Sequence, residues 1–363
     1  MRSFQWAATL DPVPGHVVKL LARVDRAAGA EGQYRDQLPH LMTGLAESAR
    51  IESITASSAI EGVFVDSVRM PGLASGSTTR FRNRSEAEFA GYRAALDYVY
   101  DSDQEPLSLG LILHLHRLLL SFADGGGGRL KLHDNLVVEG GEDGKRRVRF
   151  TPITAQETPH YMAKLVERTN LALADASTHP LIVLAAFTLD LSCIHPFADG
   201  NGRVARLVTA HLLGRVGYSV GRYISLEQLI FERKDAYYTA LGESTDQWFT
   251  DGQHTLWPWA TYLFERLGAA YQRFEARVAA ETSPGNKQDR VRNHVLSHGP
   301  AQFRISDIRN ALPGISDQTI RLVLAELRSS GLAINDGPGR SASWTRISQH
   351  SLRDDSSGHA NSR

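Results

Sequence analysis

His195-Pro-Phe-Ala-Asp-Gly-Asn-Gly-Arg-Val-Ala-Arg206 lies between two apolar segments with helical spacing, residues 180–194 and 203–216. The five residues from Asp199 to Arg203 pack two glycines, an amide and two charged side chains into one turn. Gly200 and Gly202 permit positive φ and the close approach of a ligand. The N–H groups at the start of a helix bind anions. The stretch therefore predicts an anion-binding turn between two helices.

The side chains of this turn have the chemistry needed for attack on a polyphosphate. Arg203 and Arg206 are three residues apart, so both can point at one polyphosphate. Asp199 supplies a hard oxygen for Mg²⁺, and the imidazole of His195 is suited to accepting a proton near neutral pH. A glycine-rich turn with a capping aspartate and surface arginines explains any one of these residues. The whole set favours attack of a hydroxyl on a nucleotide phosphate.

Composition limits the class of protein. The 363 residues include 40 Lys+Arg and 40 Asp+Glu, and 42% are hydrophobic, which excludes a mostly disordered chain and suggests two or three domains. Zero net charge argues against a uniformly positive surface for nucleic acid or acidic membranes. The lone Cys193 cannot form an internal disulfide. With no signal-like N-terminus and no apolar run of membrane length, we expect a cytoplasmic protein without a membrane segment.

Helical periodicity dominates the first 280 residues. We expect first-turn or capping residues at Ser85, Thr158, His179 and Ser225. One region differs: residues 136–150 have two short apolar runs around a glycine-rich turn, which predicts a β-hairpin. The hairpin is either a surface excursion or an edge that docks an extended peptide by strand addition. The expected helices are 17–27, 41–60, 85–100, 109–122, 159–174, 180–194, 203–216, 226–241 and 257–280.

The stretch from His195 to Arg206 resembles the Fic (filamentation induced by cAMP) signature, H-x-F-x-[D/E]-G-N-G-R-x-x-R, at every defined position. The resemblance implies an all-α Fic fold with the hairpin as its flap. It also implies transfer of AMP from ATP to a Ser, Thr or Tyr hydroxyl of a target protein. By position, His195 would be the general base and Asp199 would hold Mg²⁺. The phosphates would be bound by Gly200, Asn201, Gly202, Arg203 and Arg206.

An upstream segment matches a second Fic element. Ser57-Ser-Ala-Ile-Glu61-Gly62 fits the inhibitory motif [S/T]-x-x-x-E-[G/N] of the Fic class with an N-terminal inhibitory helix. A carboxylate at a helix end can pair with an arginine fork. If Glu61 holds Arg206, that arginine cannot receive the γ-phosphate, and ATP cannot seat its α-phosphate in line for attack. Ser57, Glu61 and Gly62 would then inhibit, within one chain or across a homodimer. The alternative is that Ser57 and Glu61 are ordinary polar residues of a helix surface.

Other positions carry weaker expectations. Phe197 would anchor the loop in the core, and Tyr237 or Tyr238 would either line the adenine pocket or pack in the core. Cys193 is expected to be a small buried residue, and the histidines, including His114 and His116, show no metal-ligand spacing. The departures from the Fic pattern are Lys131, where an arginine is expected before the flap, and Thr188 and Ser192 on the helix before His195.

Residues 282–288 mark a boundary rich in turn formers. Beyond it, helices at 289–297, 303–311 and from the Ser316 cap to Ser329 precede strands at 331–335 and 343–347. This order resembles a winged helix-turn-helix, an α+β module. The expected domains are an N-terminal helical region with the inhibitory motif (1–105), a Fic catalytic core (106–280), the winged helix (286–347) and a disordered tail (348–363).

The C-terminal module is mildly basic. Residues 287–347 contain nine Lys+Arg and five Asp+Glu, a local charge of +4. Residues 316–321 have the polar and basic first turn of a recognition helix, and Arg340 stands at the wing tip. The module could bind DNA, or it could contact a protein or a second copy of the chain. Because the surplus of positive charge is small, protein contact is favoured.

The expected function is an autoinhibited, Mg²⁺-dependent protein adenylyltransferase that uses ATP and modifies a protein hydroxyl, including its own. Three alternatives remain at this point. The enzyme could transfer another nucleotide, or it could remove AMP from a modified target with Glu61 orienting water. The chain could also be a DNA-binding regulator that uses the Fic core as a nucleotide sensor.

Overall fold

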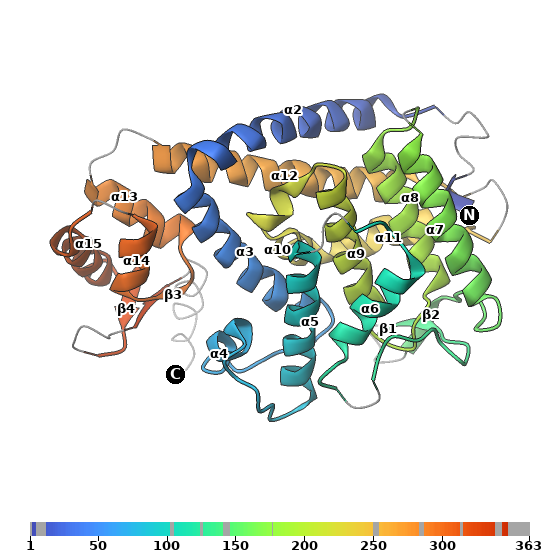
Figure 1. Ribbon diagram of the computed structural model, residues 1–363, viewed down its shortest axis with the longest axis horizontal. Helices are drawn as coiled ribbons and strands as arrows, with labels where there is room; N and C mark the ends of the chain where they lie inside the picture. Colours follow the sequence, from blue (N-terminus) through green and yellow to red (C-terminus); the bar gives the residue numbers. More distant parts are fainter. Residues whose placement is uncertain are drawn as a thin grey trace, which may run out of the picture. The chain divides into compact units, whose positions relative to one another are not determined.

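The computed structural model describes most of the chain (Figure 1). Two compact units are distinguished, one of Met1–Ala30 and Ala49–Tyr271, the other of Glu31–Ser48 and Gln272–Arg363. The domain boundaries expected from the sequence stay a prediction. The hairpin turn at 141–145, the wing tip at Arg340 and the tail from 348 lie outside the described residues. The described ranges are 2–4, 12–101, 105–123, 126–140, 146–175, 177–249, 254–282, 287–312, 315–337 and 343–347.

The first 282 residues are mostly helical, as the periodicity predicts. None of the described helices combines the length and the apolar character needed to cross a membrane. The helical elements are η1 (Arg2–Phe4), α2 (Gly15–Gln37), α3 (Pro39–Ile60), α4 (Met70–Ser75), α5 (Arg84–Asp101), α6 (Leu109–Leu119), α7 (Thr158–Ala174), α8 (Pro180–Ile194), α9 (Asn201–Arg215), η2 (Ser219–Arg222), α10 (Leu226–Phe231), α11 (Lys234–Thr245) and α12 (Trp257–Thr282).

Helix α8 forms the centre of the first unit. Every residue from Leu181 to Leu191 is buried, because this helix is apolar on all sides. The neighbours α7 and α9 pack against it, and α7 and α8 run side by side in Figure 1. Since α8 ends at Ile194, the core of the unit fixes the position at which the motif begins.

One expected helix differs in the structure. The helix expected at 226–241 is broken at Glu232 and Arg233, where α10 ends and α11 begins. After this break Lys234 Nζ donates a hydrogen bond to the Ile60 carbonyl at 2.8 Å, which ties α11 to the end of α3. The Ser225 cap is confirmed, since its side chain accepts a bond from Gln228 N.

The expected hairpin is present. Strands β1 (Val137–Gly140) and β2 (Arg146–Phe150) pair antiparallel, with a register shift between Val137 and Val138. Val138 and Val148 are exposed large apolar side chains. Among the described residues, β1 and β2 form a two-stranded sheet, and the hairpin presents apolar side chains beside the motif.

Residues 287–347 have the element order helix, strand, helix, helix, strand, strand. The elements are α13 (Lys287–Asn293), the π-helical turn η3 (His294–His298), β3 (Gln302–Phe303), α14 (Ile305–Ala311), α15 (Asp317–Ser329), β4 (Ala333–Asn335) and β5 (Trp344–Arg346). The strands form one antiparallel sheet in the order β3-β5-β4. The sequence did not predict β3, which is only two residues long. A shared core that includes Phe303, Leu324 and Trp344 joins these elements.

Candidate active site

The motif begins where α8 ends and continues into the first turn of α9. His195 has φ 49° and ψ 61°, a left-handed conformation that residues other than glycine seldom adopt. Gly200 has φ 79°, and a Cβ at this position would lie 2.9 Å from Leu119 Cδ2. Both the conformation and the space therefore require glycine at 200.

Side-chain amides and a lysine hold the loop by its backbone. Asn201 Oδ1 accepts from Phe197 N at 2.9 Å, and Asn201 Nδ2 donates to Phe197 O at 2.7 Å. Lys131 Nζ donates to Ile194 O at 3.1 Å and to Asn135 Oδ1 at 2.8 Å. Asn135 Nδ2 in turn donates to Phe197 O at 2.9 Å. Asn201 is thus a brace of the loop, and Lys131, the departure noted in the sequence, is a buried support of it.

Phe197 anchors the loop in the core, as expected. It is fully buried, and its ring stacks on His116 with centroids 3.8 Å apart. His116 Nδ1 accepts a hydrogen bond from Gly128 N at 3.0 Å. Burial lowers the pKa of His116 to about 4, so its imidazole is neutral at pH 7.

A cavity of ≈ 510 Å³ opens beside the motif. His195, Asn201, Gly202 and Arg206 line it, and Glu61 lies on the same wall. The size is typical of small-molecule sites. Its remaining lining residues come from the hairpin, α8 and α11: Val137, Val138, Arg149, Phe150, Leu191, Ser192, Lys234, Tyr237, Tyr238, Leu241 and Thr245.

His195 is neutral in this cavity. Burial, together with the ammonium of Lys131, lowers the pKa of His195 to about 4. An imidazole that is unprotonated at pH 7 can accept a proton from a hydroxyl placed in the cavity.

Arg206 is buried and held from α3. Its Nε donates to Ser57 Oγ at 2.9 Å, and its Nη2 donates to Ser57 O at 3.1 Å and to Glu61 Oε1 at 2.9 Å. A Cβ on Gly202 would lie 2.4 Å from Glu61 Oε1, so the carboxylate sits directly on this glycine. Glu61 therefore occupies space beside both the arginine and the helix N-terminus that the motif offers to an anion.

The carboxylate of Glu61 stays ionised at this position. Burial alone would raise its pKa, but the charge and hydrogen bond of Arg206, with Arg203 and Lys234, hold the pKa of Glu61 below its ordinary value. Gly62, with φ 76°, takes the left-handed conformation just after α3 ends.

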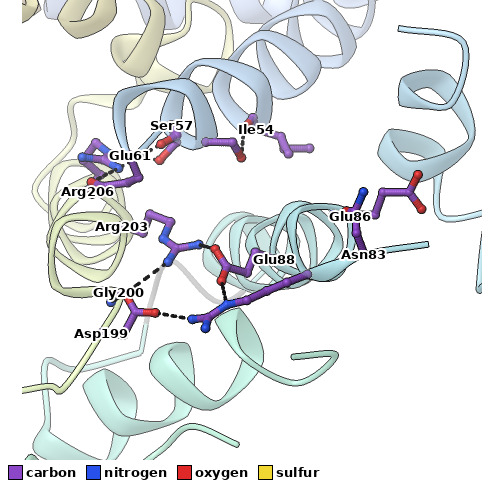
Figure 2. A network of polar contacts seen from close by, with 12 residues as sticks. Ile54, Ser57, Glu61, Asn83, Glu86, Glu88, Asp199, Gly200, Arg203 and Arg206 are labelled. Atoms are coloured by element: carbon purple, nitrogen blue, oxygen red, sulfur yellow. Dashed lines mark hydrogen bonds and ion pairs between the residues drawn. The ribbon is translucent and has the colours of Figure 1, made fainter. Parts of the chain in front are cut away.

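Asp199 and Arg203 face α5, and neither is among the residues that line the cavity (Figure 2). Arg203 Nη1 donates to Glu88 Oε2 at 2.6 Å. Asp199 Oδ2 accepts from Arg84 Nη2 at 2.6 Å, and Asp199 Oδ1 lies 3.6 Å from Arg203 Nη2. The sequence analysis missed Arg84 and Glu88. Their i,i+4 spacing marks them as a pair, but nothing in the sequence indicates that they reach the motif.

The donors fit Mg²⁺ only together with a polyphosphate. No group of three or more His, Cys, Asp or Glu side chains that could hold a metal occurs among the described residues. Asp199 offers one carboxylate, half exposed, beside the helix N-terminus at Gly200. One carboxylate with substrate phosphates and water is a common Mg²⁺ environment. Asp199 could therefore hold Mg²⁺ that arrives with phosphates.

Two tyrosines form the aromatic wall of the cavity. Tyr237 is buried against Trp259 and Tyr262, and Tyr238 lies under the guanidinium of Arg149 at 5.2 Å. Both tyrosines line the cavity, so the expected roles in core packing and in a ligand wall are compatible.

Of the remaining positions, Cys193 is buried, as expected. Thr188 accepts a hydrogen bond from Trp259 Nε1 at 2.8 Å inside the core. Ser192 bonds the Thr188 carbonyl at 2.8 Å and reaches the cavity wall.

Comparison with known proteins finds a family match and several relatives. Residues 106–213 match the Fic/DOC family. The chain is 33% identical over 136 residues to "Protein adenylyltransferase Fic" of Drosophila virilis. This match covers 36% of this chain and 25% of that protein. The chain is also 28% identical over 213 residues to "Protein adenylyltransferase fic-1" of Caenorhabditis briggsae. This match covers 56% of this chain and 36% of that protein. The chain thus spans about a quarter to a third of these relatives' length.

Among solved structures, a Fic family protein from Desulfovibrio desulfuricans G20 shares the fold with a TM-score of 0.60 at 20% identity. The match covers 93% of this chain and 98% of the other. The matched segment 106–213 contains the whole of the stretch from His195 to Arg206. Residues 106–213 of the chain are therefore a Fic domain.

Proposed function

We propose that this chain transfers AMP from ATP to a hydroxyl of a protein target and that Glu61 inhibits the transfer. The observation that carries the proposal is that His195, Gly202 and Arg206 line one cavity, while Glu61 Oε1 accepts a hydrogen bond from Arg206 at 2.9 Å. A neutral imidazole, a helix N-terminus and a buried guanidinium are the groups that a nucleotide triphosphate and an attacking hydroxyl require.

The proposed reaction is a nucleotidyl transfer. A Ser, Thr or Tyr hydroxyl oxygen forms a bond to the α-phosphorus of ATP, and the bond from this phosphorus to the β-phosphate oxygen breaks. His195 accepts the hydroxyl proton, and pyrophosphate leaves. Asn201 and the backbone of Gly200 and Gly202 shape the anion cradle.

Arg206 receives the γ-phosphate only when Glu61 has left it. Since Glu61 Oε1 also lies against Gly202, the bound carboxylate excludes phosphate from two contacts at once. Mg²⁺, held by Asp199 and the phosphates, would supply charge neutralisation. Arg203 is assigned to the same polyphosphate region through its contact with Asp199.

The hairpin is proposed as the flap that positions the target. Val137, Val138 and Phe150 of the hairpin line the same cavity as His195. An extended target segment that adds to the hairpin edge would place its hydroxyl near the imidazole.

Incorporation of label from ATP tests the proposed function. Glu61→Gly should raise incorporation into targets or into the protein itself, and adding His195→Ala should abolish it. Stronger labelling from CTP, GTP or UTP would overturn the choice of nucleotide. Release of AMP from a modified target by the wild-type protein, without any transfer, would favour the reverse reaction.

We also propose that residues 287–347 form a winged helix that contacts protein. Two arginines of the module are neutralised, since Arg309 pairs with Asp317 at 2.6 Å and Arg292 pairs with Glu326 at 2.7 Å. Leu322 on α15 is exposed, which suits a protein surface better than a phosphate backbone. Salt-sensitive, sequence-selective binding to promoter DNA that is lost in Arg321→Ala would contradict this assignment.

A further inference from the structure

Two glutamates contact the motif arginines, and their surroundings differ. Among the described residues, Glu61 accepts a hydrogen bond from Arg206, and its side chain is 32% exposed. Glu88, on α5, is 6% exposed and bonds two arginines, Arg84 and Arg203. Removing a buried carboxylate from two cations is costly. Loss of the contact of Glu61 is therefore expected to cost less free energy than loss of the two contacts of Glu88.

Glu88 belongs to a closed ring of alternating charges (Figure 2). Arg84 Nε donates to Glu88 Oε1, and Arg84 Nη2 donates to Asp199 Oδ2 at 2.6 Å. Arg203 Nη1 donates to Glu88 Oε2 at 2.6 Å, and Arg203 Nη2 lies 3.6 Å from Asp199 Oδ1. Asp199 thus stands between two arginines, and Glu88 holds both of them.

The members of the ring also differ in how far their side chains are exposed to solvent. The Arg84 side chain is 66% exposed and that of Asp199 is 50% exposed, whereas that of Arg203 is 4% exposed. An exposed ion pair contributes little free energy. The contact from Arg84 to Asp199 is therefore the part of the ring that an incoming cation can replace.

We propose that Arg84 and Glu88 are positioning residues that set the affinity of Asp199 for its divalent cation. Arg84 is a stand-in cation that Mg²⁺ displaces, and Glu88 offsets the two arginine charges that would otherwise oppose Mg²⁺. This inference rests on the proposed function, because it takes Asp199 as the metal-binding carboxylate and a polyphosphate as the other ligand.

The charges predict opposite effects for two neutralising variants. Arg84→Gln removes a cation from Asp199, so half-saturating Mg²⁺ should fall about twofold to fivefold, as for loss of an exposed ion pair. Glu88→Gln leaves both arginine charges directed at Asp199, so half-saturating Mg²⁺ should rise about tenfold, as for loss of a charged hydrogen bond.

Helix α5 offers a matched control. Glu86 is also buried and accepts from an arginine, Arg69, at 2.7 Å. Its hydrogen-bond partners among the described residues, Arg69, Arg82 and Asn83, lie outside the motif, and in Figure 2 Glu86 lies apart from the ring. Glu86→Gln should therefore leave half-saturating Mg²⁺ unchanged.

The experiment measures binding of a fluorescent ATP analogue as Mg²⁺ is titrated. The full chain carries Glu61→Gly and His195→Ala, so the site is accessible and no turnover occurs. Opposite shifts for Arg84→Gln and Glu88→Gln, with Glu86→Gln unchanged, support the proposal. Equal half-saturating Mg²⁺ in the parent and in Arg84→Gln, or shifts in the same direction, would overturn it.

Two further outcomes separate the possible failures. If the parent binds no nucleotide at any Mg²⁺ concentration, the proposed function fails, and this inference fails with it. If Glu88→Gln does not fold, as judged by thermal melting, Arg84→Gln decides alone, because its side chain is exposed and its loss leaves the core intact.

Discussion

The contact between Glu61 and Arg206 makes a quantitative prediction about nucleotide affinity. Arg206 Nη2 donates to Glu61 Oε1 at 2.9 Å, and Ser57 keeps two further bonds to the same guanidinium. Glu61→Gly therefore removes one charged hydrogen bond but leaves Arg206 in place. Such a bond contributes about 1.5–3 kcal/mol, and the partial exposure of Glu61 favours the lower value.

The expected result is that Glu61→Gly binds ATP about tenfold more tightly, the equivalent of about 1.4 kcal/mol. AMP should gain less affinity than ATP, because it has no γ-phosphate to compete with Glu61 for Arg206. Glu61→Gln, which keeps the size and loses the charge, should be intermediate. Isothermal titration calorimetry of the full chain, in the His195→Ala background, measures all three affinities.

Glu86→Gln is the control for loss of a carboxylate elsewhere in the same unit, and it should bind ATP as the parent does. The reasoning is refuted if Glu61→Gly binds ATP no more tightly than the parent. It is also refuted if AMP gains as much affinity as ATP, because the effect would then not depend on the γ-phosphate.

Three further predictions concern the loop and its base. Burial and Lys131 lower the pKa of His195 to about 4. The kcat/KM of the Glu61→Gly protein should therefore stay level down to about pH 6 and fall below about pH 5. A fall of kcat/KM with its midpoint near the ordinary histidine pKa of about 6.5 would contradict this prediction. Lys131→Met should move this fall in kcat/KM to higher pH, because a charge that lowers the pKa of His195 is lost. An unchanged pH profile would exclude Lys131 as a cause of the lowered pKa of His195. Asn201→Ala should destabilise the protein by about 2 kcal/mol in denaturant unfolding, because it leaves the N–H of Phe197 unpaired and removes one of the two hydrogen bonds to the Phe197 carbonyl. Unchanged stability would show that the loop does not need the brace.

The sequence predicted the parts of the site that are local or that belong to a long motif. The helical spacing before His195 and after Gly202 led to α8 and α9, and the signature placed His195 and Arg206 together. The contact from Glu61 to Arg206 spans 145 positions, and the second motif was needed to expect it.

Other contacts could not be predicted because they depend on tertiary packing without a sequence signal. Glu88 meets Arg203 across 115 positions, and its neighbour Glu86 on the same helix has an equally ordinary sequence context. In the sequence, Lys131 is only a departure from the Fic pattern. In the structure, its ammonium donates a hydrogen bond to the Ile194 carbonyl. The role of Lys131 in holding the loop follows from the burial of its side chain. Hydrophobic periodicity predicts burial in helices and strands, but not in a loop.

The activity that we propose is transfer of AMP to protein hydroxyls in the cavity beside His195. Mass spectrometry of a cell lysate treated with the Glu61→Gly protein and ATP measures this transfer. An adenylyl group is expected on Ser, Thr or Tyr side chains, and it should be absent when His195→Ala is added. No adenylyl group, or the same modification with the double variant, would contradict the proposed activity.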